Sequence, residues 1–329
     1  MAARCIRPEV HLILAAHGLT GLPVRPLFGQ SNLCFAVGDQ YVLRLNQRRR
    51  DRFFIDEQVA MWLGSRVPVA QTIILDRSQR VVPFEYAIQT RLPGRRLTQV
   101  WQDLDDRGRN RILDQLVDIL QALGEVKFER FGALIEGLAA PDWASDREYD
   151  LQRLLAEAKK HRGLDRELLM DIWAYFQSHR HALEGAEAVL VHGDFHFDNL
   201  LAEGDRITGV VDWEFARAAP PDMELDQLLR FLRMPKRFVA EELEGTVSPT
   251  DFADVLPGLM ARMPELFATP QLGTRLTIYA LIYDLNMLIQ ACGRWPAAVG
   301  QIEGWLRDVL NSVGKNAWQA VLLPSAFGS

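Results

Sequence analysis

The chain has 329 residues, of which 48% are hydrophobic and 24% charged, a balance typical of a soluble globular protein with enough apolar material for two cores. Its formal net charge of −6 argues against a nucleic-acid partner. No stretch approaches the length of a membrane span, and the three cysteines form no C-x-x-C pair. We therefore expect a cytoplasmic protein without a membrane partner, disulfides or a cysteine metal site.

Residues 24 to 92 have the pattern of a small β-rich region. Strands are expected at Val24–Leu27, Leu33–Val37, Tyr41–Leu45, Thr72–Leu75 and Glu85–Gln89. Apolar residues four apart predict one helix over Ile55–Leu63, and an amphipathic helix is expected within Val10–Leu19. Pro93-Gly94 then breaks the pattern. The sequence thus predicts an N-terminal domain over residues 1–92.

From Leu97 onward the pattern becomes helical. Helices are expected at Arg111–Leu123, Leu151–Ala158, Leu168–Phe176, Leu225–Leu232 and Thr277–Ile289. Strands are expected only at Ala188–Val191 and in a hairpin over Leu200–Val211 that turns at Glu203-Gly204-Asp205-Arg206. Pro249–Pro264 is interpreted as a looser surface region. The fold class is therefore α+β, with a mainly helical C-terminal domain over residues 93–329.

The residues that carry chemistry lie between Val191 and Glu214. Asp194 is followed five residues later by Asn199, and after the hairpin Asp212 ends a hydrophobic strand. Phosphoryl transfer needs a carboxylate near the acceptor hydroxyl and metal ions that bridge the phosphate oxygens. Asp194 can supply that carboxylate, and Asn199 and Asp212 offer hard oxygen ligands suited to Mg²⁺. The hairpin folds the chain back, so Asp212 can approach Asn199.

His192-Gly193-Asp194 with Asn199 reproduces the spacing of the kinase catalytic loop H-R-D-x-x-x-x-N, with glycine in the middle place. Asp212-Trp213-Glu214 resembles the D-F-G segment of the aminoglycoside phosphotransferase and choline kinase group. This resemblance implies a two-lobed protein-kinase-like fold with a β-rich N-terminal lobe and a mainly helical C-terminal lobe. It also implies that Asp194 is the catalytic base, that His192 organises the loop, and that Asn199 and Asp212 are Mg²⁺ ligands.

The helix that follows has three candidate carboxylates. The resemblance implies that Asp226 is the structural aspartate that holds the catalytic loop. Asp222 and Glu224 could contribute to an acidic acceptor pocket. The interpretation we favour is that they are ordinary carboxylates at a helix N-terminus, where the helix dipole stabilises negative charge.

The same resemblance extends to the N-terminal region. It places the phosphate-covering loop at Gly29, Gln30, Ser31 and Asn32, where backbone N–H groups can cradle phosphate. It makes Arg44 the phosphate-pairing cation and Glu57 its partner. The hinge whose backbone holds adenine is Gln89–Leu92, so Gln89, Thr90 and Arg91 are assigned to cofactor binding.

The resemblance implies an ATP- and Mg²⁺-dependent kinase, with GTP as a possible nucleotide, that acts on a hydroxyl of a small molecule. An aminoglycoside-type antibiotic is the leading acceptor, and choline, homoserine or a sugar is the alternative. A nucleotide-binding pseudokinase also remains open. So does a metal-dependent hydrolase, because His192 and His196 alternate with Asp194 and Asp198. We expect a monomer or weak homodimer.

Overall fold

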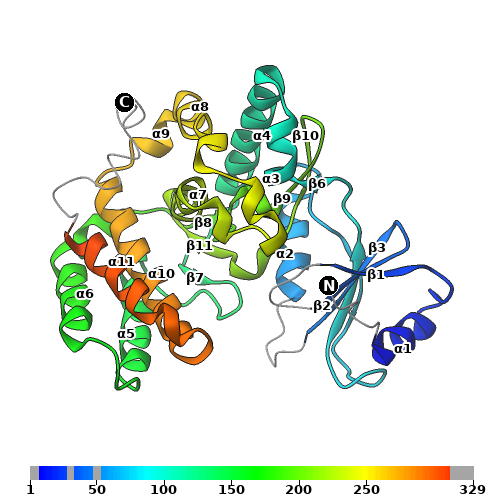
Figure 1. The fold of residues 1–329 in the computed structure, drawn as a ribbon, viewed down its shortest axis with the longest axis horizontal. Coiled ribbons are helices and arrows are strands. Elements are labelled where there is room, and N and C mark those ends of the chain that lie inside the picture. The colour runs from blue at the N-terminus through cyan, green and yellow to red at the C-terminus, as the bar shows by residue number, and fades with distance from the viewer. Residues whose placement is uncertain (1–6, 28–32, 47–52, 312–329) are drawn as a thin grey trace. The chain divides into compact units, whose positions relative to one another are not determined.

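The structure is a computed structural model that describes residues 7–27, 33–46 and 53–311 (Figure 1). The chain divides into two compact units. The first is formed by the described residues of the ranges 1–115, 197–214 and 236–247. The second is formed by those of the ranges 116–196, 215–235 and 248–329. This division does not follow a single boundary after Leu92, because the segment after Pro93-Gly94 pairs with the hairpin near residue 200. An N-terminal antiparallel sheet and a mainly helical remainder confirm the α+β class.

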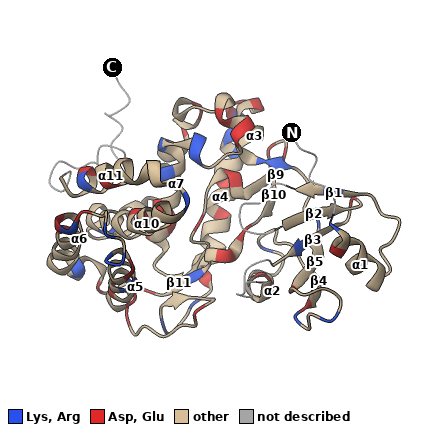
Figure 2. Cartoon of the chain, turned by 60° about the horizontal axis from the view of Figure 1, so that its bottom comes forward, with Lys and Arg blue, Asp and Glu red and all other residues tan. Residues whose placement is uncertain are grey.

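The first unit contains a five-stranded antiparallel sheet in the order β1-β2-β3-β5-β4 (Figure 2). Its strands are β1 (Val24–Leu27), β2 (Leu33–Val37), β3 (Tyr41–Leu45), β4 (Thr72–Asp76) and β5 (Tyr86–Thr90). Each predicted strand is present within one residue of its expected bounds. The reason is that β-branched and aromatic residues alternate in short runs, and turn residues stand at both ends of each run.

Two helices accompany this sheet. Helix α1 (Pro8–Ala16) buries Val10, Ile13 and Leu14 in the same apolar core as the sheet residues Phe35 and Leu43. Helix α2 (Phe53–Leu63) follows β3, as the four-residue spacing predicts. The expected helix within Val10–Leu19 is therefore present but begins and ends earlier.

A second sheet of the first unit has the order β10-β9-β6, from β6 (Arg95–Arg96), β9 (Leu200–Glu203) and β10 (Arg206–Val210). The predicted hairpin is thus confirmed. Gly94 has φ +100°, and a Cβ on it would lie 2.6 Å from the carbonyl oxygen of Ala202 and 2.7 Å from Thr208 Oγ1. Only glycine fits here, because the chain after β5 crosses directly against the hairpin.

Helix α4 also fixes the hairpin. The side chain of Gln115, on α4 (Asp106–Glu125), donates to the carbonyl oxygen of Asp205 at 2.8 Å and accepts from the N–H of Ile207 at 2.8 Å. These two bonds hold the hairpin turn against the helix. The short helix α3 (Leu97–Val100) precedes α4.

The second unit is built mainly from helices around a three-stranded sheet in the order β7-β11-β8. The strands are β7 (Gly132–Ala133), β8 (Val189–Val191) and β11 (Arg217–Ala219). The helices are α5 (Trp143–Ala158), α6 (Arg166–His179), α7 (Glu224–Arg233), α8 (Val255–Arg262), α9 (Pro264–Phe267), α10 (Leu272–Arg294) and α11 (Val299–Asn311). Figure 2 shows acidic and basic residues interspersed along α5 and α6.

Three expectations about this unit are wrong. Strands β7 and β11 pair in one sheet with β8, although the sequence pattern indicates strands only at Ala188–Val191 and in the hairpin. The region Pro249–Pro264 is not simply loose surface, since α8 lies within it and buries Val255 and Leu256. Helix α10 is long and apolar enough to cross a membrane, although the sequence pattern indicates no such stretch. However, 61% of its most apolar window is buried inside the unit, as in the core helix of a globular protein.

Gly94→Ala tests the close approach of the hairpin. A side chain at positive φ costs about 1–2 kcal/mol, and overpacking adds about 1–3 kcal/mol, so urea unfolding should show a loss of about 2–5 kcal/mol. Gly204→Ala is the matched control, because Gly204 has φ +55° but a Cβ there meets nothing within 4 Å. Gly204→Ala should lower the unfolding free energy by about 1–2 kcal/mol, the cost of positive φ alone. Equal losses in both variants would contradict the steric role of Gly94.

Candidate active site

The segment after β8 forms a tight loop over His192, Gly193 and Asp194. His192 is fully buried, and its Nδ1 accepts from the N–H of Asp194 at 3.3 Å. Asp194 is partly exposed, and its Oδ1 lies 3.4 Å from His196 Nε2. The His196 ring stacks on Phe231 of α7 with centroids 5.9 Å apart. The two histidines therefore fix the loop and leave the Asp194 carboxylate accessible.

Gly193 explains the glycine in the middle of this loop. Its φ is +76°, and a Cβ built on it would overlap the carbonyl oxygen of Phe215. Any other residue would be strained and would push the chain after Trp213-Glu214 away from the loop. The loop geometry therefore requires glycine at this position.

The backbone of the loop is held by Glu224 at the start of α7. Its Oε1 accepts from the N–H of His192, and its Oε2 accepts from the N–H of Gly193 at 3.2 Å. Glu224 is buried, and burial raises its pKa to about 8 even though the two N–H groups oppose that shift. The interpretation of Glu224 as an ordinary helix N-terminal carboxylate is therefore incomplete.

The prediction that Asp226 is the structural aspartate that holds the loop after β8 is wrong. Asp226 accepts from Arg230 Nε at 3.2 Å and from Gln227 Nε2 at 3.2 Å, both on its own helix. Arg230 also donates to Asp284 of α10 at 2.8 Å. The physical reason is helical phase, because residues two apart on a helix point about 200° from each other. Asp222 is likewise occupied, by a bidentate pair with Arg275 at 2.8 and 2.7 Å.

In the first unit the hairpin brings the two proposed metal ligands together. Asn199 is buried at the end of a short 3₁₀ turn, and its carbonyl oxygen accepts from the N–H of Val211 at 3.0 Å. Asp212, the next residue, has φ +68°, a conformation that non-glycine residues rarely adopt. Such backbone strain is typical of functional sites.

These two side chains fit a magnesium ion by their chemistry. Both offer hard oxygen donors, which Mg²⁺ prefers. Their surroundings are acidic as well, because the carboxylates of Asp56, Asp212 and Glu214 all interact electrostatically with the guanidinium of Arg44. Three carboxylates around one guanidinium leave negative charge for a divalent cation to balance.

Arg44 lies on β3 and is paired with Asp56, not with Glu57. Arg44 Nη1 donates to Asp56 Oδ2 at 2.7 Å; the Asp56 side chain is buried, and that of Arg44 is 13% exposed. Burial opposes the charged form of Arg44, but the Asp56 carboxylate outweighs it and raises the Arg44 pKa. Glu57 is exposed on the other side of α2. The predicted partner is therefore wrong by one residue, which turns a helical side chain by about 100°.

The residues expected to form the hinge make hydrogen bonds of two kinds, through the side chain of Gln89 and through the backbone N–H groups of Thr90 and Arg91. Gln89 is buried, and its side chain donates to Asp56 at 3.3 Å and to Thr72 at 3.2 Å. The N–H groups of Thr90 and Arg91 donate to the carbonyl oxygens of Gln71 and Gln40 at 2.9 and 2.7 Å. These two N–H groups are therefore already used within the chain.

Gly29, Gln30, Ser31 and Asn32 lie outside the described residues. Within residues 7–27, 33–46 and 53–311, no group of three or more His, Cys, Asp or Glu side chains could hold a metal ion. That part of the chain thus lacks the donor set that a binuclear hydrolase needs.

Two of the residues that matter here, Asp56 and Glu224, were missed or undervalued from sequence. A signal was present for both, since each carboxylate lies at helical spacing from buried apolar residues. Asp56 shares a stripe with Phe53, Ala60 and Leu63, and Glu224 shares one with Leu228. An acid within an apolar stripe indicates a buried partner.

Comparison with known proteins agrees with this geometry. A family model described as the phosphotransferase enzyme family matches residues 24–248. No curated protein matches the sequence. The solved structure of aminoglycoside phosphotransferase APH(4)-Ia, as a thermostable mutant with AMP-PNP and hygromycin B, has a TM-score of 0.67 at 19% identity and covers 92% of this chain and 97% of that one.

Two other solved structures are similar. The streptomycin-ATP complex of APH(2″)-IIa gives a TM-score of 0.65 at 14% identity, over 92% of this chain and 97% of that chain. The GDP complex of aminoglycoside 2′-phosphotransferase-IIIa gives 0.65 at 16% identity, over 93% and 99%. At these identities the likeness establishes the fold, which is the protein-kinase-like fold expected from the catalytic-loop spacing.

The paired variants Asp56→Ala and Glu57→Ala test the partner of Arg44. Removal of Asp56 leaves a buried guanidinium without its carboxylate and should cost about 3–5 kcal/mol in urea unfolding. Removal of the exposed Glu57 should change the unfolding free energy by no more than about 0.5 kcal/mol. A larger loss for Glu57→Ala than for Asp56→Ala would make Glu57 the partner after all.

Glu224→Gln tests the raised pKa of the loop anchor. Between its ordinary value of 4.5 and about 8, Glu224 keeps its proton in the folded chain but loses it in the unfolded chain. Its contribution to stability is therefore complete at low pH and is lost as pH rises toward 8, by up to about 1.4 kcal/mol per pH unit. The unfolding free energy of the variant should fall less steeply over this range. Parallel curves for the two proteins would refute the shift.

Proposed function

The chain belongs to the phosphotransferase enzyme family and is a small-molecule kinase, and we propose that it transfers the γ-phosphate of ATP to a hydroxyl group with the help of Mg²⁺. The observation that carries this proposal is the hairpin that joins Asn199 to the segment ending at Asp212, in the same unit as the buried Arg44–Asp56 pair. This set supplies oxygen ligands and a fixed cation, the parts that phosphoryl transfer requires.

Each residue has a defined part in this proposal. Asn199 and Asp212 hold Mg²⁺, which supplies charge neutralisation at the phosphate oxygens when bound. Arg44, fixed in place by Asp56, pairs with the phosphates. Gln89 holds the Arg44–Asp56 ion pair in position through hydrogen bonds to both side chains. The hinge Gln89–Leu92 and the loop Gly29–Asn32 complete the nucleotide site in this proposal, and GTP remains a possible donor.

Asp194 is the catalytic base in this proposal. It accepts the proton of the acceptor hydroxyl, or orients that hydroxyl, as the acceptor oxygen bonds to the γ-phosphorus and the bond from that phosphorus to the β-phosphate oxygen breaks to release ADP. His192 organises the loop through the bond from the Asp194 N–H, and Glu224 holds the backbone beneath it. Asp194 is therefore fixed through its main chain, and its carboxylate remains accessible to the acceptor.

The acceptor is proposed to be a hydroxyl-bearing small molecule, with an aminoglycoside-type antibiotic as the first class to test. Two of the similar solved structures contain hygromycin B or streptomycin, which supports that order. Choline, homoserine and sugars are the alternatives. We further propose a cytoplasmic monomer or weak homodimer without a nucleic-acid or membrane partner.

Thermal-shift and coupled ATPase assays test the function. The protein should be stabilised by Mg·ATP or Mg·GTP and should turn over one acceptor from a panel of aminoglycosides, choline, homoserine and common sugars. Binding of nucleotide without turnover on any acceptor would favour a pseudokinase. Failure to bind either nucleotide would refute the proposal.

Asp194→Asn and Asp212→Asn separate the two roles at constant side-chain size. Asp194→Asn should lower kcat by about 10²–10⁴-fold and leave the Kd for Mg·ATP unchanged, because only the base is lost. Asp212→Asn should instead weaken Mg²⁺-dependent nucleotide binding, measured by titration calorimetry with and without Mg²⁺. Undiminished turnover in both variants would show that the assigned roles are wrong.

A further inference from the structure

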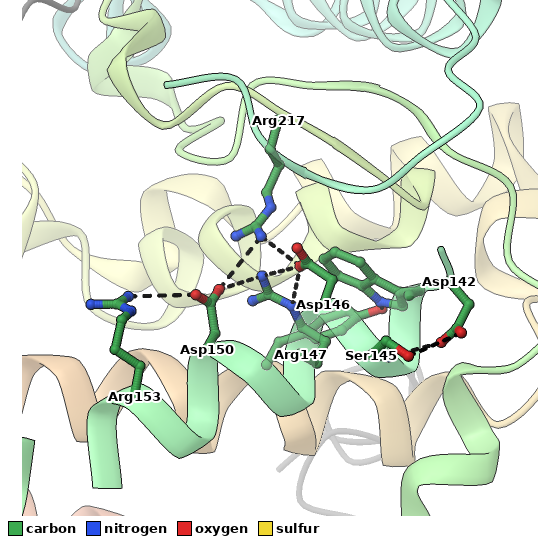
Figure 3. A network of polar contacts seen from close by, with 9 residues as sticks. Asp142, Ser145, Asp146, Arg147, Asp150, Arg153 and Arg217 are labelled. Carbon is green, nitrogen blue, oxygen red and sulfur yellow. Dashed lines mark hydrogen bonds and ion pairs between the residues drawn. The ribbon is translucent and has the colours of Figure 1, made fainter. Parts of the chain in front are cut away.

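A buried charge cluster in the second unit joins α5 to strand β11 (Figure 3). Arg217 of β11 donates to Asp146 Oδ2 at 2.6 Å and lies 3.5 Å from Asp150 Oδ2. Arg147 donates to the same two carboxylates, at 2.6 Å each. Figure 3 shows Arg217 reaching from its strand to these carboxylates, which project from α5. Two guanidiniums and two carboxylates therefore balance within one cluster.

The cluster continues through Trp143. Its ring lies 4.3 Å from the Arg147 guanidinium and 5.3 Å from that of Arg217. Trp143 Nε1 donates to the Tyr279 hydroxyl at 2.9 Å, and that hydroxyl donates to Asp222 Oδ2 at 2.9 Å. One connected polar network thus runs from β11 through α5 and α10 to the turn before α7.

Both ends of this network lie beside the catalytic loop along the chain. Arg217 is the register partner of Val191, which directly precedes His192. Arg217 is also two residues after Phe215, whose carbonyl oxygen closes against Gly193. At the other end, Asp222 is two residues before Glu224, which accepts from the loop backbone. The strand and the helix start that hold the loop are therefore fixed to the same network.

Stability alone is a weak explanation for such a cluster, since a buried ion network often stabilises no more than an apolar replacement of equal volume. The ion pairs instead fix the position and orientation of β11 relative to α5, because hydrogen bonds between a guanidinium and carboxylates are directional. Arg217 is 12% exposed at its side chain, and its fork can bond only when β11 has one position relative to α5. Burial opposes ionisation of Asp150, but Arg147 and Arg217 outweigh it and lower its pKa, so the carboxylate stays charged.

We propose that Arg217 is a positioning residue of this kinase, which fixes strand β11 on α5 and thereby sets the place of the His192–Asp194 loop. The kinetic part of this inference rests on the proposed function. The Arg217 guanidinium bonds to the α5 carboxylates Asp146 and Asp150, so its effect on turnover passes through the position of β11 and then through the loop.

Arg217→Met tests the inference, because methionine keeps apolar bulk and removes the fork. Arg153→Met is the matched control, since Arg153 contacts the same Asp150 at 3.4 Å but is 53% exposed and lies on α5 itself. With the acceptor found in the panel, Arg217→Met should lower kcat by about 10- to 100-fold while KM for Mg·ATP stays within about twofold. Arg217→Lys, which keeps the charge, should fall between, and Arg153→Met should match wild type.

Amide hydrogen exchange gives a readout that does not need turnover. In Arg217→Met, the amides of residues 190–194 should exchange faster while those of α5 keep their protection, and Arg153→Met should leave both unchanged. Unchanged exchange at 190–194 in Arg217→Met would overturn the inference, even if kcat fell. Should Arg217→Met fail to fold, Arg217→Lys takes its place and must show the faster exchange. If wild type turned over no acceptor, the proposed function would fail, and the exchange experiment would still decide the positioning role.

Discussion

The arrangement of the candidate active site depends on one buried carboxylate that accepts hydrogen bonds from two backbone N–H groups. Glu224 accepts from the N–H groups of His192 and Gly193, and Gly193 adopts a left-handed conformation in which the Phe215 carbonyl oxygen lies where a Cβ would be. Glu224 therefore holds this loop through its main chain. The Asp194 side chain is partly exposed, and burial raises the pKa of Glu224, so the hydrogen bonds that hold the loop depend on pH.

Charge pairing follows the same logic in both units. In the first, Asp56 holds the Arg44 guanidinium, which also interacts electrostatically with the carboxylate of Asp212. In the second, Arg275, Arg230 and Arg217 each occupy buried carboxylates. Asp222 and Asp226 are engaged in this way, which explains why Asp194 stands out as the partly exposed acid of the loop.

Local patterns in the sequence are sufficient to predict most of the elements. The five strands, the hairpin after Asn199 and most helices lie close to their expected bounds because alternation, helical spacing and turn residues act over short ranges. The side chains that pair with one another are less predictable from the sequence. Glu57 and Asp226 each lie one or two residues from the residue that makes the contact, and one helical residue is enough to move a side chain from the buried to the exposed face. The site roles of His192, Asp194, Asn199 and Asp212 stay predictions.

The sequence by itself determined the class of chemistry. The spacing of His192, Gly193, Asp194 and Asn199, with Asp212 after a hairpin, is a local pattern that indicates a kinase, and the family match agrees. Only the tertiary structure decided which acid pairs with Arg44, which one holds the catalytic loop, and that Arg217 ties β11 to α5. The reason is physical: these contacts join residues between 12 and 71 positions apart, and burial selects among several carboxylates that the sequence alone presents as equivalent.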